Sequence, residues 1–143
     1  MSYTRDARKP KARILIADDH QVVRSGVRNL LDGHTRWEIC GEAENGREAV
    51  AKVIELKPDM IILDLSMPLM NGFEAAAEIR KAAANTKIIV FSMHDSRQIS
   101  EQAIRSGADA YVVKNSLFGE LERTIHMLLD GDSRHSADSP GKP

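Results

Sequence analysis

The apolar residues of this chain gather in five short runs separated by more polar stretches. Each run spans about five residues, favours branched side chains and shows little polar alternation, which is typical of strands buried on both faces of a parallel sheet. The second run is the least apolar, so we expect it near an edge of the sheet. The runs occupy residues 13–17, 37–41, 59–63, 87–91 and 109–113.

Between and after these runs, apolar residues recur at the three- and four-residue spacing of amphipathic helices. Val22 begins the apolar stripe of the first predicted helix, and Ser116 is a candidate cap for the last. Asn45 followed by Glu48 resembles a capping box. The predicted helices lie at residues 22–31, 45–56, 73–83, 96–106 and 116–129.

Strand and helix thus alternate five times with short connections. This pattern predicts an α/β fold, in which right-handed crossovers join parallel strands and helices cover both faces of the sheet. We predict a flavodoxin-like (βα)5 doubly wound sheet with strand order 2-1-3-4-5. Ligands of such folds bind outside the carboxyl ends of the strands, so the residues that follow each strand are the candidates for function.

Length and composition indicate one globular domain. The chain has 143 residues, 42% of them hydrophobic and 29% charged. The net charge of -1 argues against direct binding to nucleic acid or to a membrane surface, and no apolar run approaches the roughly 20 residues of a membrane helix. A single cysteine, Cys40, rules out a disulfide framework, so we expect a soluble cytoplasmic protein.

The two ends of the chain lack a periodic apolar pattern. Residues 1–11 are polar and basic, and we interpret them as a disordered leader. Residues 131–143 have the Ser, Pro and Gly content of a flexible tail or of the start of a linker. The folded domain is therefore predicted to span residues 12–130.

Charged and hydroxyl residues follow four of the predicted strands. Asp18 and Asp19 follow the first strand, Asp64 the third, Ser92 the fourth and Lys114 the fifth. If strands one and three are neighbours, the three carboxylates crowd together and either raise one another's pKa or require a cation. Such hard oxygen ligands suit Mg²⁺, with Mn²⁺ as the alternative. A carboxylate nucleophile, a cation, a lysine and a hydroxyl are together the groups needed to receive a phosphoryl group.

These residues resemble the receiver domain of two-component response regulators, from about Arg13 to Leu129. No single piece is specific, but the pieces occur in the right order and at strand ends. They are residues 14–20, 58–68 with Asp64, 71–72, Ser92 and 107–114 with Lys114. The segments 18–20 and 42–46 are most similar to the NarL/FixJ subfamily, whose members usually carry a C-terminal helix-turn-helix DNA-binding domain.

The resemblance implies an acceptor and its metal ligands. Asp64 would be the phosphoacceptor, and Asp19 and Asp64 would bind Mg²⁺. Asp18 would assist, largely through water, and the main-chain carbonyl of Ser66 would complete the protein's share. Because Ser66 lacks a charge or an amide to orient an attacking water, we expect a phosphoprotein switch with slow self-hydrolysis rather than an enzyme.

The resemblance also implies how the switch works. Lys114 would contact the phosphoryl group, Ser92 would move to hydrogen-bond it, and Tyr111 would be the coupled switch aromatic. Tyr111 fits equally well as a core residue with its hydroxyl at the surface. Met93 follows Ser92, where many receivers have a small residue, and we expect its side chain to shield the phosphoryl group partly from water or from a phosphatase.

The expected partner is a histidine kinase or a phosphotransfer protein that donates the phosphoryl group. The resemblance adds a possible homodimer formed through the first and last helices. If a DNA-binding domain follows in the full protein, the output is control of transcription. Otherwise the chain is a stand-alone receiver that acts by protein–protein contact.

Two other classes of function use a similar fold. An aspartyl-phosphate hydrolase needs a second carboxylate two residues after the nucleophile, where this chain has Ser66. A flavin or nucleotide binder needs a phosphate loop rich in glycine or hydroxyl groups after the first strand, where Asp18 and Asp19 would repel phosphate.

Overall fold

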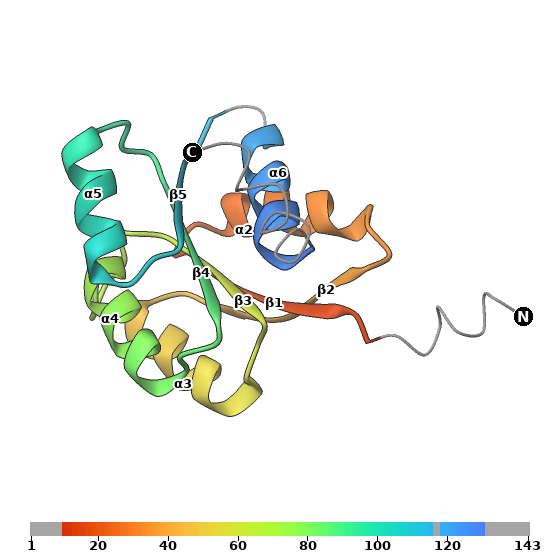
Figure 1. Ribbon diagram of the computed structural model, residues 1–143, viewed down its shortest axis with the longest axis horizontal. Helices are drawn as coiled ribbons and strands as arrows, with labels where there is room; N and C mark the ends of the chain where they lie inside the picture. Colours follow the sequence, from red (N-terminus) through yellow and green to blue (C-terminus); the bar gives the residue numbers. More distant parts are fainter. Residues whose placement is uncertain (1–9, 116–117, 131–143) are drawn as a thin grey trace, which may run out of the picture.

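The fold is a single parallel sheet with helices on both faces (Figure 1). The computed structural model describes residues 10–115 and 118–130. The strand order is β2-β1-β3-β4-β5, which confirms the predicted topology and puts β2 at an edge. The strands are β1 (Ala12–Ala17), β2 (Trp37–Ala43), β3 (Met60–Leu63), β4 (Lys87–Ser92) and β5 (Ala110–Val113).

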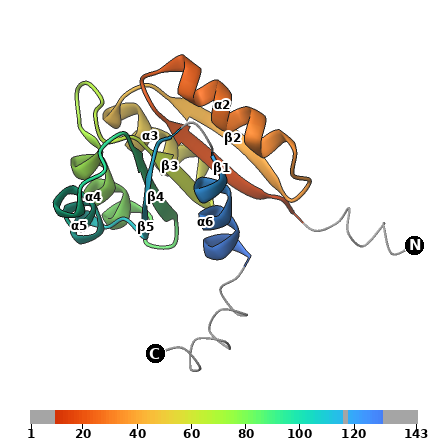
Figure 2. The ribbon, with the colours of Figure 1, turned by 90° about the horizontal axis from the view of Figure 1, so that it is seen from above.

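Five helices complete a three-layer sandwich. Helices α2 and α6 cover one face of the sheet, and α3, α4 and α5 cover the other (Figures 1 and 2). Their bounds are α2 (Gln21–Asp32), α3 (Gly46–Leu56), α4 (Gly72–Ala82), α5 (Arg97–Ser106) and α6 (Gly119–Leu129).

Alternate residues of the strands belong to two separate hydrophobic cores, one on each face of the sheet. In β1, Leu15 and Ala17 pack with residues of α3 and α4, whereas Ile14 and Ile16 pack with residues of α2 and α6. All four side chains are buried, because successive residues of a strand point to opposite faces and both faces are covered. This double burial explains why the apolar runs show no alternation.

Two apolar residues from the stripes of the predicted helices are exposed in the structure. Val22 is 83% exposed and Ile104 is 46% exposed, so neither belongs to a buried stripe. Val22 lies on the same face of α2 as Ser25 and Asn29, which are also exposed. The predicted cap Ser116 lies outside the described residues, and Phe118 occupies the N-cap position of α6 without a side-chain cap.

The helix starts next to the third strand are set by asparagine caps. Asn45 accepts a hydrogen bond from the Glu48 amide at 2.8 Å, as its spacing predicts, although the Glu48 carboxylate bonds the Glu44 amide instead of completing the box. A complete capping box forms at α4, where Asn71 and Glu74 exchange both bonds. This box ends the loop that begins at Asp64, and it starts α4 earlier than predicted.

No helix within the described ranges is long and apolar enough to cross a membrane. Nearly all of the predicted leader and tail lie outside those ranges, so the predicted domain boundaries stay a prediction.

Candidate functional site

The carboxyl ends of β1 and β3 bring two aspartates side by side. Ala17 lies opposite Leu63 in the parallel ladder, and the Asp64 amide donates to the Ala17 carbonyl at 2.9 Å. The residues that follow each strand, Asp18 and Asp64, therefore meet at the edge of the sheet. Carboxylate oxygens of Asp18, Asp19 and Asp64 lie within 4.8 Å of one another, which confirms the predicted convergence.

Lys114 reaches into this acidic cluster from the end of β5. Its ammonium lies 2.7 Å from Asp18 Oδ2 and 3.2 Å from Asp64 Oδ1, and all three side chains are buried. Its amide donates to the carbonyl of Ser92, which ties the ends of β4 and β5 together. Three carboxylates against one ammonium leave two negative charges without a counter-charge in the cluster.

The pKa of the Asp64 carboxyl group is raised by its surroundings in this cluster. Burial raises the pKa of its carboxyl group and the charge of Asp18 raises it further, while Lys114 opposes both effects. Asp64 Oδ2 is buried and has no hydrogen-bond partner among the described residues. A buried acceptor in that state costs on the order of 1–3 kcal/mol, so this oxygen is suited to bind a ligand. An orphan oxygen and a deficit of two positive charges fit a divalent cation with oxygen ligands.

The predicted switch residues Ser92 and Tyr111 both hold the backbone of His94. The Ser92 hydroxyl accepts a hydrogen bond from the His94 amide at 3.1 Å, and the Tyr111 hydroxyl donates to the His94 carbonyl at 2.6 Å. The Tyr111 ring is partly buried against the core beneath α3, α4 and α5. The backbone of His94, in the loop after β4, is thus hydrogen-bonded through both its amide and its carbonyl group.

The loop between Asp64 and α4 is tightly folded. The Met70 amide donates to the Pro68 carbonyl at 2.8 Å, and Leu69 between them has φ 71°, which describes a strained γ-turn. A Cβ atom on Gly72 would lie 2.3 Å from the Asp64 carbonyl oxygen, so only glycine fits there. The loop folds back against the backbone of Asp64 and presents the carboxylate on a rigid support.

The sequence that forms this site matches a known protein family. The family model described as "Response regulator receiver domain" matches residues 14–126, which is most of the chain. The chain belongs to this family.

Individual relatives show which response regulators this receiver domain is similar to. It is 35% identical over 121 residues to the nitrate/nitrite response regulator protein NarL of Escherichia coli K12, covering 85% of this chain and 56% of that protein. The curated relatives that it matches include further response regulators such as NreC and VraR, which confirms the predicted resemblance to NarL-type regulators. The chain spans little more than half the length of these relatives.

Solved structures agree with this assignment. The receiver domain of the putative response regulator NarL from Mycobacterium tuberculosis is 32% identical, with a TM-score of 0.77 and coverage of 82% of this chain and 94% of that one. The response regulator TrrA from Thermotoga maritima, in complex with Mg²⁺-BeF, is 38% identical, with a TM-score of 0.74 and coverage of 82% and 98%. The chain is therefore a receiver domain of the two-component response regulators.

The receiver structure reveals a supporting residue that the sequence analysis missed. Arg24 is almost fully buried on α2, donates to the Asp18 carbonyl at 2.6 Å and pairs with Glu42 on β2 at 2.8 Å. Burial raises the pKa of the Glu42 carboxyl group, but Arg28 and Arg24 outweigh that effect and lower it overall. The available signal was the position of Arg24 one turn before Val27 on the buried face of α2.

His20 is a second contact that the sequence did not reveal. Its ring is largely exposed, yet Nδ1 lies 3.1 Å from Asp18 Oδ1 and 3.0 Å from Asp19 Oδ1. Its position directly after the two aspartates was the only hint. The exposed side of the acidic cluster is thus bordered by an imidazole.

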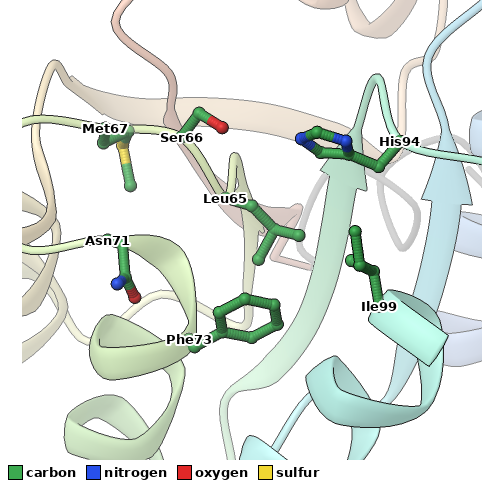
Figure 3. Close-up of a pocket in the computed structure, with 7 residues that line it drawn as sticks. All are labelled: Leu65, Ser66, Met67, Asn71, Phe73, His94 and Ile99. Carbon is green, nitrogen blue, oxygen red and sulfur yellow. The ribbon is translucent and has the colours of Figure 1, made fainter. Parts of the chain in front are cut away.

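A pocket of about 390 Å³ opens beside the acidic site. Figure 3 shows Leu65, Phe73 and Ile99 converging on it, with Ser66 and His94 at its upper edge. Ser66 is exposed in the loop after β3, and Met93 is 72% exposed beside Ser92. The structure gives the positions of these two residues, and their predicted roles stay predictions.

Proposed function

We propose that this receiver domain accepts a phosphoryl group on Asp64 from a phosphohistidine of a histidine kinase or a phosphotransfer protein. The carrying observation is the Asp64 carboxylate itself: one oxygen contacts Lys114, and the other lacks a partner among the described residues. A carboxylate with a raised pKa is also the more basic and the more nucleophilic one once it is ionised.

In the proposed transfer, Asp64 is the nucleophile and Lys114 is the neighbouring cation. An oxygen of Asp64 attacks phosphorus, the P–N bond of the phosphohistidine breaks, and the imidazole leaves with the electron pair and takes up a proton. The product is an acyl phosphate on Asp64. The Lys114 ammonium neutralises charge on the transferring oxygens and then pairs with the phosphoryl group.

Asp18, Asp19 and Asp64 would hold Mg²⁺, or Mn²⁺ in its place, with the Ser66 carbonyl as a further ligand. When bound, the ion supplies the two positive charges that the cluster lacks and offsets charge on the phosphoryl oxygens. Arg24 acts as a positioning residue, because its bond to the Asp18 carbonyl fixes the backbone that carries two of these ligands.

The contacts of His94 support a switching mechanism. If Ser92 turns to donate its hydroxyl to the phosphoryl group, the His94 amide loses its acceptor. The segment that also accepts from Tyr111 is then free to move, and Tyr111 moves with it. Within α5, only Ala103 is fully buried, so this helix is weakly anchored and can follow.

The output rests on what accompanies the receiver in its full protein. We propose control of transcription through a DNA-binding domain, with dimerisation along the face of α2 and α6, or signalling by protein–protein contact if the receiver acts alone. The receiver is a switch rather than an enzyme, since Ser66 offers no group to activate water.

Phosphoryl incorporation tests the proposal directly. Incubated with Mg²⁺ and a small acyl phosphate, the wild-type chain should gain the mass of one phosphoryl group, and Asp64→Asn should gain none. Asp59→Asn is the matched control, because Asp59 lies just before β3 at the opposite end from Asp64. Incorporation that survives in Asp64→Asn, or that never occurs in wild type, would contradict the proposal.

Met93 provides a test of phosphoryl lifetime. If its side chain shields the acyl phosphate, Met93→Ala should lose the phosphoryl group faster than wild type, measured as decay of the phosphorylated mass. Met127→Ala removes another exposed methionine, on α6, and should leave the rate unchanged; Met127 is 43% exposed and Met93 72%. An unchanged or slower decay in Met93→Ala would end the shielding hypothesis.

A further inference from the structure

We infer that His34, Glu122 and His126 form a second metal site, of the Zn²⁺ type, on the side of the domain built by α2 and α6. His34 lies in the connection from α2 to β2, and the other two lie on α6. One ligand atom from each lies within 4.8 Å of the others. None of these residues belongs to the acidic cluster, so the inference is independent of the proposed phosphoryl transfer.

The spacing on α6 already suits a metal. Glu122 and His126 are four residues apart, which places both side chains on one face of the helix. His34 comes from a segment far away in sequence, and its Nε2 lies 2.7 Å from Glu122 Oε2. Zinc binds imidazole nitrogen and carboxylate oxygen at about 2.0–2.2 Å, so the ligand atoms of a tetrahedral site lie roughly 3.5 Å apart. Side-chain rotations that move atoms by about 1 Å would reach that geometry.

A neighbouring carboxylate prepares His126 as a ligand. Its Nδ1 lies 2.9 Å from Asp130 Oδ2, one turn further along the chain. When Nδ1 carries the proton donated to Asp130, the lone pair lies on Nε2, and that nitrogen is the ligand. Zinc-bound histidines commonly show this carboxylate–imidazole pairing, which fixes the tautomer and the ring orientation.

Trp37 supports both imidazole rings. It is buried on β2, with its ring stacked on His34 at 4.2 Å between centroids and tilted against His126 at 4.6 Å. The side chains of His34, Glu122 and His126 are 23%, 36% and 50% exposed. The rings are therefore braced on an apolar wall while an ion can still reach them from solvent.

The ligand set selects the class of metal. Two imidazoles and one carboxylate favour Zn²⁺ and other late first-row ions over Mg²⁺, which prefers oxygen ligands alone. Three protein ligands leave a fourth position for water. The bound ion would link the α2–β2 connection to α6. In the structure, His34 contacts Glu122 through a hydrogen bond and His126 through an edge contact between the two imidazole rings.

The single tryptophan of the chain, Trp37, contacts both histidines, so its fluorescence reports on metal binding at this site. Ni²⁺ is a suitable probe, because it takes similar ligands and quenches the fluorescence of a nearby indole. Titrated into the full chain in excess Mg²⁺, it should quench Trp37 in a saturable manner. The quenching should disappear in His34→Gln and in His126→Gln, and it should persist in Glu120→Gln, an exposed glutamate on the same helix.

Zinc counting gives an independent readout. In equilibrium dialysis, His126→Gln should bind one Zn²⁺ fewer per chain than wild type, whatever the acidic cluster binds. Asp130→Asn should keep the site with about 10-fold weaker affinity, as expected for a residue that only positions a ligand. Equal zinc content in wild type and both histidine variants, or quenching that survives in them, would overturn the inference. If one variant fails to fold, the other still decides.

Discussion

Replacing Lys114 with methionine should lower the free energy of unfolding by about 3–5 kcal/mol at neutral pH without divalent cations, the range for breaking a buried ion pair. The Lys114 ammonium contacts both Asp18 and Asp64, and none of the three side chains is more than 6% exposed. Methionine fills a similar volume but leaves the aspartates buried with no cation between them. The loss comes from this uncompensated charge rather than from lost packing.

Urea denaturation of the variant and a matched control measures the effect. Lys52→Met is that control, because Lys52 pairs with Glu48 at 3.3 Å where both side chains are about one-third exposed. Its loss should stay below about 1 kcal/mol, as for other exposed ion pairs. Added Mg²⁺ should also stabilise Lys114→Met more than wild type, since the ion replaces the missing charge. Equal losses in the two variants would show that Lys114 does not offset the buried carboxylates.

The second large effect has the opposite sign, because Asp64→Asn should make the metal-free domain more stable. Burial and the charge of Asp18 raise the pKa of the Asp64 carboxyl group in the folded state. When the pKa of a carboxyl group is raised in the folded state, the folded domain becomes less stable as the pH rises. The loss begins near the ordinary carboxyl pKa of about 4 and continues through the folded-state pKa. Asparagine keeps the shape without the charge, and Lys114 keeps its contact with Asp18.

The expected gain is about 0.5–2 kcal/mol at neutral pH, in the range of other stabilising substitutions. The advantage of Asp64→Asn over wild type should vanish below about pH 4 and grow as the pH rises to neutral. Thermal unfolding across this pH range measures it, with Asp59→Asn as a control that lacks the gain. A difference that does not vary with pH would contradict this account. The charge on Asp64 therefore lowers the stability of the metal-free domain.

Strands were the most predictable part of the fold. Residues such as Ile61 and Ile62 are buried on opposite faces of β3, and a short apolar run without alternation is typical of a strand covered on both faces. The strand-end positions of Asp18, Asp64 and Lys114 then followed, because all parallel strands end at the same edge. Helix faces were less predictable. Val22 is apolar but shares the exposed face of α2 with Ser25 and Asn29.

The supporting contacts around the site were beyond sequence reasoning. Arg24 reads as a surface residue until β2 is placed at the edge beside β1, which brings Glu42 within 2.8 Å of it. The hydrogen bond from Tyr111 to the His94 carbonyl forms only because the ends of β4 and β5 lie side by side. The Arg24–Glu42 and Tyr111–His94 contacts join residues 18 and 17 positions apart in the chain, and local pattern says nothing about them.

The sequence by itself determined the alternation of strands and helices, and it determined that three aspartates and a lysine would meet at one edge of the sheet. Periodicity and chain order decide which side chains can be buried and where parallel strands end, and the flavodoxin-like strand order puts strands one and three side by side. Only the tertiary structure decided that one oxygen of Asp64 would remain without a partner and that His34 would face Glu122 and His126. These features depend on distances of a few ångströms between distant segments, and such distances are set by packing of the whole domain.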